Sequence, residues 1–279
     1  MTITPATRTQ DSTKEPFHQG NGLSTPIRPD APDDGRYVSK AEYWATYYDH
    51  ADASYEWNDG YLEAKPLPNQ IQYNLYLWFL LLLKQYLQVY QNGWLMGLET
   101  GFSMTVPDLK LPGRLKETVR KPDIAVIRHN NPIPWGEWER SYGGICDLCV
   151  EALSDSHKVD IERDTKIKKA EYEFAGVQEY YILDPSDEYM RFYERTATGI
   201  YVAMTPDALG VLHSNVLPGF QFRLRDLHRK PSLEALALDE VYHGYVLLEY
   251  QAALTRAEAL AAELTLAQAE LARLRKQQS

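Results

Sequence analysis

The chain has 279 residues, of which 44% are apolar, and a formal net charge of −10 at pH 7. This acidic balance argues against a protein that coats nucleic acid non-specifically, because such binding depends on neutralising phosphates. Two cysteines are too few for a disulfide framework, and no apolar run is long enough to span a bilayer. The first residues lack the basic and apolar segments of a signal peptide, so we expect a cytoplasmic protein with no membrane partner.

We expect one core domain, over residues 37–230, between two atypical ends. Residues 1–36 are rich in Thr, Pro, Asp, Gly and Gln without periodicity, which predicts a disordered N-terminal arm. Over residues 231–279 the composition shifts to Ala, Leu and Glu, which predicts a C-terminal helix. Its apolar residues recur in steps of three and four: Tyr250, Ala253, Ala257, Leu260, Leu264, Ala267, Leu271 and Leu274. Such a heptad seam either pairs two chains or folds back on its own domain.

The first part of the core is predicted to contain a short helix, a hairpin and a long helix. Ser39 and Glu42 form a capping box at the start of the short helix. Asp59-Gly60 supplies the tight turn of a hairpin over residues 54–63. An amphipathic helix is predicted over residues 69–90, where the apolar residues at helical spacing are Leu75, Phe79, Leu82, Leu83 and Tyr86. We expect a strand over residues 94–106 and a polar loop over residues 108–119.

The segment over residues 121–176 carries the candidate chemistry. Asp123 precedes an apolar strand over residues 124–127, and Glu151 interrupts a second apolar strand over residues 145–153. A helix is expected over residues 164–175, with Asp164 as its N-cap and Gly176 just after its end. A buried carboxylate is very costly unless something neutralises it. Two such acids followed by a lysine-bearing helix predict a divalent metal site with a cationic helper.

The remaining connections and strands complete the predicted core. The loop over residues 128–144 is long and contains Trp135 and Trp138, so it is either a lid or binding loop or a loop pinned to the body by its tryptophans. Further strands are predicted over residues 177–185 and 217–224, with a hairpin over residues 189–204. Cys146 and Cys149 have no second pair of ligands for structural zinc, so we expect reduced core thiols.

The two acids are expected on neighbouring strands of one sheet. Carboxylate oxygens suit Mg²⁺, which keeps several waters and binds through one or two carboxylates plus substrate phosphate. Such a metal offsets the charge that develops on phosphate and activates water. A lysine within reach of that water orients it or offsets charge.

These residues resemble the PD-(D/E)xK nuclease superfamily, and more closely its Uma-type restriction endonuclease family. The resemblance runs from Ser39 to about Leu227. The motifs that carry it, in order, are Tyr55-Glu56 with Asp59-Gly60, Pro122-Asp123, Val150-Glu151-Ala152-Leu153-Ser154, the helix positions Asp164, Lys168 and Tyr172, Ala175-Gly176-Val177-Gln178-Glu179-Tyr180, and Asp184-Pro185.

The resemblance implies an α/β fold, a restriction-endonuclease-like mixed β-sheet flanked by helices, here with a coiled-coil-like C-terminal helical tail. It also implies an endonuclease that hydrolyses DNA phosphodiester bonds with Mg²⁺, or with Mn²⁺ as an alternative. Asp123 and Glu151 would be the metal ligands, Lys168 the catalytic lysine and Glu56 an auxiliary acid near the metal. DNA would be the partner, and we expect a homodimer that pairs through the C-terminal helix.

The chain departs from the family pattern at two places. The superfamily lysine usually lies two residues after the glutamate, where this chain has Leu153, so Lys168 from the following helix takes that part. The family also carries a histidine just before its long helix, where this chain has Gln70 and Gln72. An alternative is therefore a catalytically impaired binding or assembly protein that oligomerises through its C-terminal helix.

Each site residue also has a purely structural interpretation. Asp123 could be a turn acid that only accepts backbone hydrogen bonds. Glu151 could form a structural ion pair with Lys168. Glu56 could be a surface acid of its hairpin.

Overall fold

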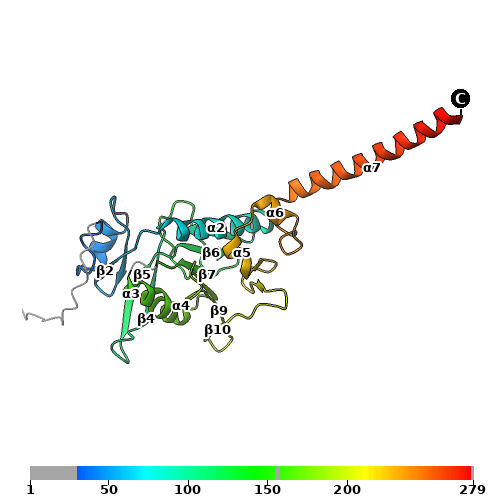
Figure 1. Ribbon diagram of the computed structural model, residues 1–279. Helices are drawn as coiled ribbons and strands as arrows, with labels where there is room; N and C mark the ends of the chain where they lie inside the picture. The colour runs from blue at the N-terminus through cyan, green and yellow to red at the C-terminus, as the bar shows by residue number, and fades with distance from the viewer. Residues whose placement is uncertain (1–29, 98, 155–156, 278–279) are drawn as a thin grey trace, which may run out of the picture.

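A six-stranded mixed sheet forms the centre of the structure (Figure 1). The computed structural model describes residues 30–97, 99–154 and 157–277. Strands β7 and β8 run parallel, and the other neighbours in this sheet are antiparallel. The strands, in spatial order, are β10 (Tyr201–Ala203), β9 (Arg191–Arg195), β8 (Glu179–Leu183), β7 (Leu148–Ala152), β6 (Ile124–Arg128) and β3 (Gly93–Gly97).

A second, four-stranded antiparallel sheet lies beside the first. Its strands, in spatial order, are β2 (Tyr61–Ala64), β1 (Tyr55–Asn58), β5 (Leu115–Arg120) and β4 (Phe102–Pro107). The predicted hairpin is confirmed, since β1 and β2 pair across a turn in which Asp59 and Gly60 have φ angles of 52° and 99°. Glycine tolerates this left-handed backbone without strain, and aspartate tolerates it better than most residues.

Two predictions about residues 94–119 are wrong. The single strand predicted over residues 94–106 is two strands, β3 and β4, which belong to different sheets. The predicted loop over residues 108–119 contains β5, which pairs with both β4 and β1. The polar side chains of β5 suggested a loop because they would be exposed in an ordinary strand. In the structure Lys116, Thr118 and Arg120 are buried and find polar partners.

Helix α2 (Gln70–Tyr90) covers one face of the six-stranded sheet (Figure 1). The predicted apolar stripe is confirmed, because Leu75, Phe79, Leu82, Leu83 and Tyr86 are all buried. The ring of Phe79 contacts Tyr181 of β8 and Phe222 of the C-terminal part. Asn69 caps the helix by accepting hydrogen bonds from the backbone N–H groups of Ile71 and Gln72.

The helical segment after β7 lies against the opposite face of the sheet and against β4. It consists of α3 (Lys158–Glu162), a π-helical turn η2 (Arg163–Lys168) and α4 (Lys169–Ala175). The predicted N-cap at Asp164 is therefore wrong, since the helix starts earlier and Asp164 lies buried inside it. Gly176 ends the helix with φ 102°, as its position predicts.

The packed structure begins before the predicted boundary at residue 37. Residues 1–29 of the predicted arm lie outside the described residues. Ala31 is buried, and the backbone of Gly35 donates a hydrogen bond to Leu62 of β2. The short predicted helix follows as α1 (Lys40–Glu42) and the π-helical turn η1 (Tyr43–Tyr47), with Ser39 as its N-cap.

The core also extends past the predicted boundary at residue 230. The strand predicted over residues 217–224 is shorter and pairs with a strand that was missed: β12 (Gln221–Arg223) pairs with β11 (Val211–His213). Two short helices follow, α5 (Leu224–Arg229) and α6 (Leu233–Ala237). Residues 236–246 join the core through Leu236, Ala237, Val241, Tyr242, Tyr245 and Val246. The boundary was placed too early because these tyrosines and short helices lack the heptad pattern that follows them.

Helix α7 (Leu248–Gln277) stands apart from the body (Figure 1). None of its residues is buried, and its leucines are largely exposed, with Leu260 at 64% and Leu264 at 60%. None of the described helices combines the length and the apolar content needed to cross a bilayer.

Candidate active site

Strands β6 and β7 bring the two predicted ligands together. Ile124 pairs with Val150 in antiparallel register, so Asp123 and Glu151 are the next opposing positions along the two strands. The backbone N–H of Ala152 donates a hydrogen bond to Asp123 Oδ2 at 2.7 Å. The Asp123 side chain keeps 24% of its surface exposed, whereas Glu151 is almost fully buried. One acid therefore faces solvent and the other lies behind it.

Glu151 is held by one hydroxyl and one ammonium group. Tyr172 donates its hydroxyl to Glu151 Oε1 at 2.9 Å, and Lys168 Nζ lies 3.1 Å from Glu151 Oε2. Burial raises the pKa of Glu151 to about 8; Asp123 acts in the same direction and Lys168 opposes it. The carboxylate form is therefore only partly compensated by the protein around it.

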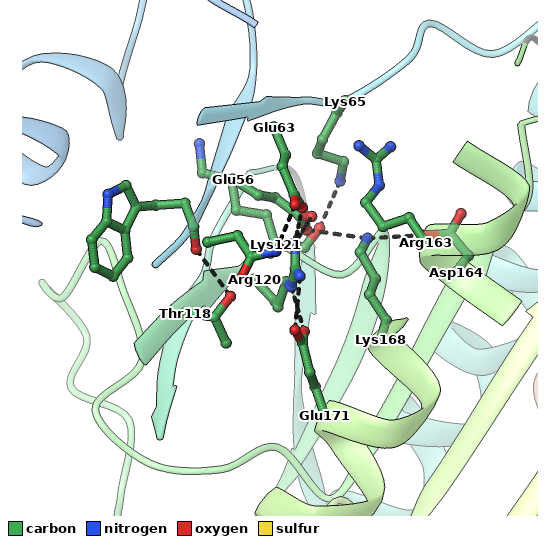
Figure 2. A network of polar contacts seen from close by, with 12 residues as sticks. Glu56, Glu63, Lys65, Thr118, Arg120, Lys121, Arg163, Asp164, Lys168 and Glu171 are labelled. Carbon is green, nitrogen blue, oxygen red and sulfur yellow. Dashed lines mark hydrogen bonds and ion pairs between the residues drawn. The ribbon is translucent and has the colours of Figure 1, made fainter. Parts of the chain in front are cut away.

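Lys168 points inward from the π-helical turn η2 and contacts three acids, of which Figure 2 labels Glu56 and Asp164. Its Nζ lies 3.1 Å from Glu56 Oε1, 3.1 Å from Glu151 Oε2 and 3.3 Å from Asp164 Oδ1. Burial disfavours the charge, but Glu151 and Glu56 outweigh it and raise the pKa of Lys168 above its usual value. The lysine therefore carries a positive charge in the interior. Single π-helical turns of this kind often occur at functional sites.

Glu56 is fully buried, so the interpretation of a surface hairpin acid is wrong. Its Oε1 accepts a hydrogen bond from the backbone N–H of Lys121 at 2.8 Å, and its Oε2 lies 3.1 Å from the Arg120 guanidinium. Burial opposes ionisation, but Lys168 and Arg120 together lower the pKa of Glu56. Glu56 is thus an ionised acid that links the lysine to Arg120.

Arg120 closes this network on the side of the second sheet (Figure 2). Its guanidinium binds Glu171 at 2.7 Å and 3.0 Å and Glu63 at 2.5 Å, in addition to Glu56. Lys116 adds a further ion pair to Glu171 at 2.8 Å. Charged groups from both sheets and from the helix therefore form one network of ion pairs directly behind Asp123 and Glu151.

Lys65 is a site residue that the sequence did not indicate. Its Nζ donates to Asp123 Oδ1 at 2.8 Å and to the backbone carbonyl of Lys121 at 2.7 Å. Burial disfavours its charge, but Asp123, Glu99 and Glu151 together outweigh burial and raise the pKa of Lys65. The residue lies one position after β2, far along the chain from Asp123. No motif marks it, and only the meeting of the two sheets brings it to the site.

A cavity of about 270 Å³ opens beside Asp123. Its walls are formed by α2, the segment after β2 and the ends of β6 and β7. Its lining includes Asp52, Lys65, Tyr73, Tyr76, Glu99 and Asp123. Glu56, Glu151 and Lys168 do not line the cavity, so they support its floor from behind.

The sequence matches a model of a known protein family over residues 41–225. The matching family is Uma2, described as putative restriction endonuclease. The chain belongs to the Uma2 family. The matched region contains Glu56, Asp123, Glu151 and Lys168, and it ends before α7.

The fold of this Uma2 protein is similar to that of a solved structure. That crystal structure, of a putative nuclease from Anabaena variabilis ATCC 29413, aligns with a TM-score of 0.51 at 17% sequence identity. The alignment covers 69% of this chain and 98% of the other. At this identity the likeness shows the fold alone, and it confirms the predicted restriction-endonuclease-like α/β fold. No curated protein sequence matches the chain.

Asp123 and Glu151 are the two carboxylates of this Uma2 protein that could hold a divalent metal. Among residues 30–97, 99–154 and 157–277, no group of three or more His, Cys, Asp or Glu side chains forms a metal cluster. Mg²⁺ needs only one or two protein carboxylates, which Asp123 and Glu151 can supply. Burial disfavours the charge of Glu151, and a nearby divalent cation would favour it. Cys146 and Cys149 are buried free thiols, as expected.

Proposed function

We propose that this Uma2 protein is a metal-dependent endonuclease that hydrolyses DNA phosphodiester bonds. The observation that supports this most is that Asp123, directly before β6, lies next to Glu151 of β7, with the ammonium of Lys168 3.1 Å from Glu151. Asp123 and Glu151 would hold Mg²⁺ or Mn²⁺. The bound metal would offset the charge developing on the phosphate and activate water.

The chain's own residues would act mainly through charge and position. In the hydrolysis a water oxygen bonds to phosphorus, the bond to the leaving oxygen breaks, and the leaving oxygen takes up a proton. Lys168 stays protonated beside Glu151 and Glu56, so it fixes the Glu151 carboxylate and is not a base. Lys65 lines the cavity next to Asp123, where its ammonium can offset the negative charge of the phosphate.

The test is DNA cleavage with Mg²⁺ or Mn²⁺, on supercoiled plasmid and on single-stranded and branched DNA. We expect Asp123→Asn and Glu151→Gln to lose cleavage by about a hundredfold or more, as for other groups that act in the transition state. The matched control is Glu162→Gln, because Glu162 is an exposed acid of α3 that pairs only with Lys166 among the contacts described here. Equal cleavage by the wild type and all three variants would identify a contaminating nuclease and contradict the proposal.

A second candidate is a nuclease-fold binding protein without catalysis. It is favoured because both oxygens of Asp123 and of Glu151 already have protein partners: Lys65 and the Ala152 N–H for Asp123, Lys168 and Tyr172 for Glu151. In addition, Gln72, near the place of the family histidine, serves the cap of α2 by accepting from the Asn69 N–H. Calorimetry separates the two candidates, since metal binding that Glu151→Gln abolishes supports the nuclease, and no metal binding supports the second.

For either candidate we propose a homodimer paired through α7. A helix of thirty residues with no buried side chain is poorly stabilised alone, because helices in water depend on packing of an apolar face. The seam residues Leu260, Leu264, Leu271 and Leu274 remain 45–64% exposed on this helix. A second copy of the same seam would cover them.

A further inference from the structure

The cavity beside Asp123 has an aromatic and apolar wall that nothing in the described structure covers. Tyr73 and Tyr76 lie one turn apart at the start of α2, with ring centroids 6.3 Å apart and planes inclined by 33°. Tyr73 is 48% exposed, and Leu67 on the adjoining segment is 74% exposed. Pro66 and Pro68 also line this wall. Large apolar groups exposed together next to a candidate active site indicate a ligand surface.

The remaining walls of the cavity are acidic. Asp30, Asp52 and Glu99 line it together with Asp123, and Lys65 is the one cation among its lining residues. Lys65 is already engaged by Asp123 at 2.8 Å. Such walls repel additional phosphates, so a second stretch of nucleic-acid backbone is a poor occupant. Carboxylates instead accept hydrogen bonds from amino groups, such as the exocyclic amino group of cytosine.

The occupant that suits both walls is flat, uncharged and rich in N–H donors. A nucleobase has these properties, and aromatic side chains stack on bases with a gain of about 1–3 kcal/mol per base. The volume of about 270 Å³ lies near the lower end of the roughly 300–1,000 Å³ typical of small-ligand sites. That is room for one base and not for a base pair with its backbones.

We propose that this cavity binds one unpaired, amino-bearing nucleobase of the DNA substrate, stacked on Tyr73 and hydrogen-bonded to Asp52 or Glu99. The inference deepens the proposed function and rests on it for one point, that the scissile phosphate lies at Asp123. A base inside a duplex cannot enter without leaving the stack, which costs a few kcal/mol. The preferred substrate is therefore single-stranded DNA or the unpaired part of branched DNA.

The test measures binding without turnover. Short oligonucleotides carrying one 2-aminopurine, a fluorescent base with an exocyclic amino group, are titrated with the full-length Glu151→Gln protein in EDTA. We expect the single strand to bind at least tenfold more tightly than the matching duplex, with quenching of the fluorescence by stacking. Tyr73→Ala in the same background should weaken single-strand binding by roughly tenfold or more. Competition by oligo(dC) should exceed competition by oligo(dT), which has no exocyclic amino group.

The matched control is Trp138→Ala, which removes an aromatic ring that is 93% exposed and lies outside the cavity lining. It should leave binding unchanged. Duplex bound as tightly as single strand, or Tyr73→Ala binding like the parent while Trp138→Ala binds weakly, would overturn the inference. These readouts do not need cleavage. If the wild type binds the base but does not cleave DNA, the cavity assignment stands and the proposed nuclease activity is contradicted. If Tyr73→Ala cleaves and binds like its parent, the nuclease activity stands and the cavity assignment is contradicted.

Discussion

Arg120 compensates the negative charge of the acids behind the site. It is fully buried and binds Glu56, Glu63 and Glu171, which themselves come from β1, β2 and α4. A buried ion pair adds little net stability, because desolvation offsets the attraction. Removing one partner is different, since the remaining charges are left buried without compensation. The network therefore fixes the geometry of the site more than it adds to the total stability.

We predict that Arg120→Met lowers the free energy of unfolding by about 3–5 kcal/mol, the usual cost of a broken buried pair. Methionine keeps most of the side-chain length but removes the guanidinium partner that Glu56, Glu63 and Glu171 share. The matched control is Arg114→Met, because Arg114 is 46% exposed and pairs with Asp59 and Asp108 at the surface. That variant should lose less than about 1 kcal/mol. Urea unfolding at pH 7 measures both, and equal losses would contradict the assigned role of Arg120.

The acid side of the same network makes stability depend on pH. Burial opposes ionisation of Glu63, but Arg120 and Arg163 together outweigh it and lower the pKa from 4.5 to about 2. A lowered pKa stabilises the fold above the ordinary value, and this stabilisation is lost as the pH falls through the folded-state value. The free energy of unfolding falls as the pH drops from 4.5 to 2. We predict that this fall is smaller in Glu63→Gln than in the wild type, by about 1–3 kcal/mol. Urea unfolding across this range checks it, and an unchanged slope would contradict it.

Sequence alone could indicate Asp123, Glu151 and Lys168 but not Lys65 or Arg120. An acid at the mouth of an apolar strand, or inside one, stands out against its neighbours, and a lysine-bearing helix follows both. Lys65 lies in the connection just after β2, and Arg120 ends the polar strand β5, so a charge at either position does not stand out. Their roles depend on contacts with residues more than fifty positions away, which no local pattern records.

Helix α2 connects stability with the cavity at the scale of elements. Its buried stripe packs on the sheet, while its first turns present Tyr73 and Tyr76 to the cavity. Asn69 holds that end by accepting two backbone hydrogen bonds. Periodicity predicted this helix and its stripe closely, because 3.6-residue spacing is a strong local signal. The division of residues 94–119 between two sheets was missed, because pairing between distant strands leaves no such signal.

We predict that Asn69→Ala lowers the free energy of unfolding by about 1 kcal/mol, whereas Asn69→Gly costs only a few tenths. Alanine removes the side-chain acceptor, while glycine lets the backbone at the cap be solvated. Thermal or urea unfolding measures the difference. Hydrogen exchange should also show faster exchange over residues 70–73, and an Ala variant as stable as the parent would show that the cap is dispensable.

The whole molecule divides at residue 247, between a packed body and a projecting helix. Residues 236–246 are buried with the core, whereas α7 has no buried residue. We predict that a chain ending at residue 247 unfolds with the same free energy as the full chain, within about 0.5 kcal/mol. Light scattering should find it monomeric and the full chain dimeric, because α7 is the proposed pairing surface. A dimeric shortened chain would contradict pairing through α7.

A chain ending at residue 230 should not fold. It loses six buried apolar residues. Burying each of the larger ones contributes about 1.5–3 kcal/mol to the free energy of unfolding, and the sum is comparable to the whole stability of such a domain. Far-UV circular dichroism and proteolysis measure the outcome. A folded product would instead support the boundary that the composition first suggested.

Binding of Mn²⁺, measured by calorimetry, tests most directly the claim that Asp123 and Glu151 form a metal site. We expect one binding event in the wild type and in Glu162→Gln, and affinity reduced at least about tenfold in Asp123→Asn and Glu151→Gln, as for a lost ligand or supporting group. If the wild type shows no heat of Mn²⁺ binding, or if neither Asp123→Asn nor Glu151→Gln weakens the binding, Asp123 and Glu151 do not form a metal site.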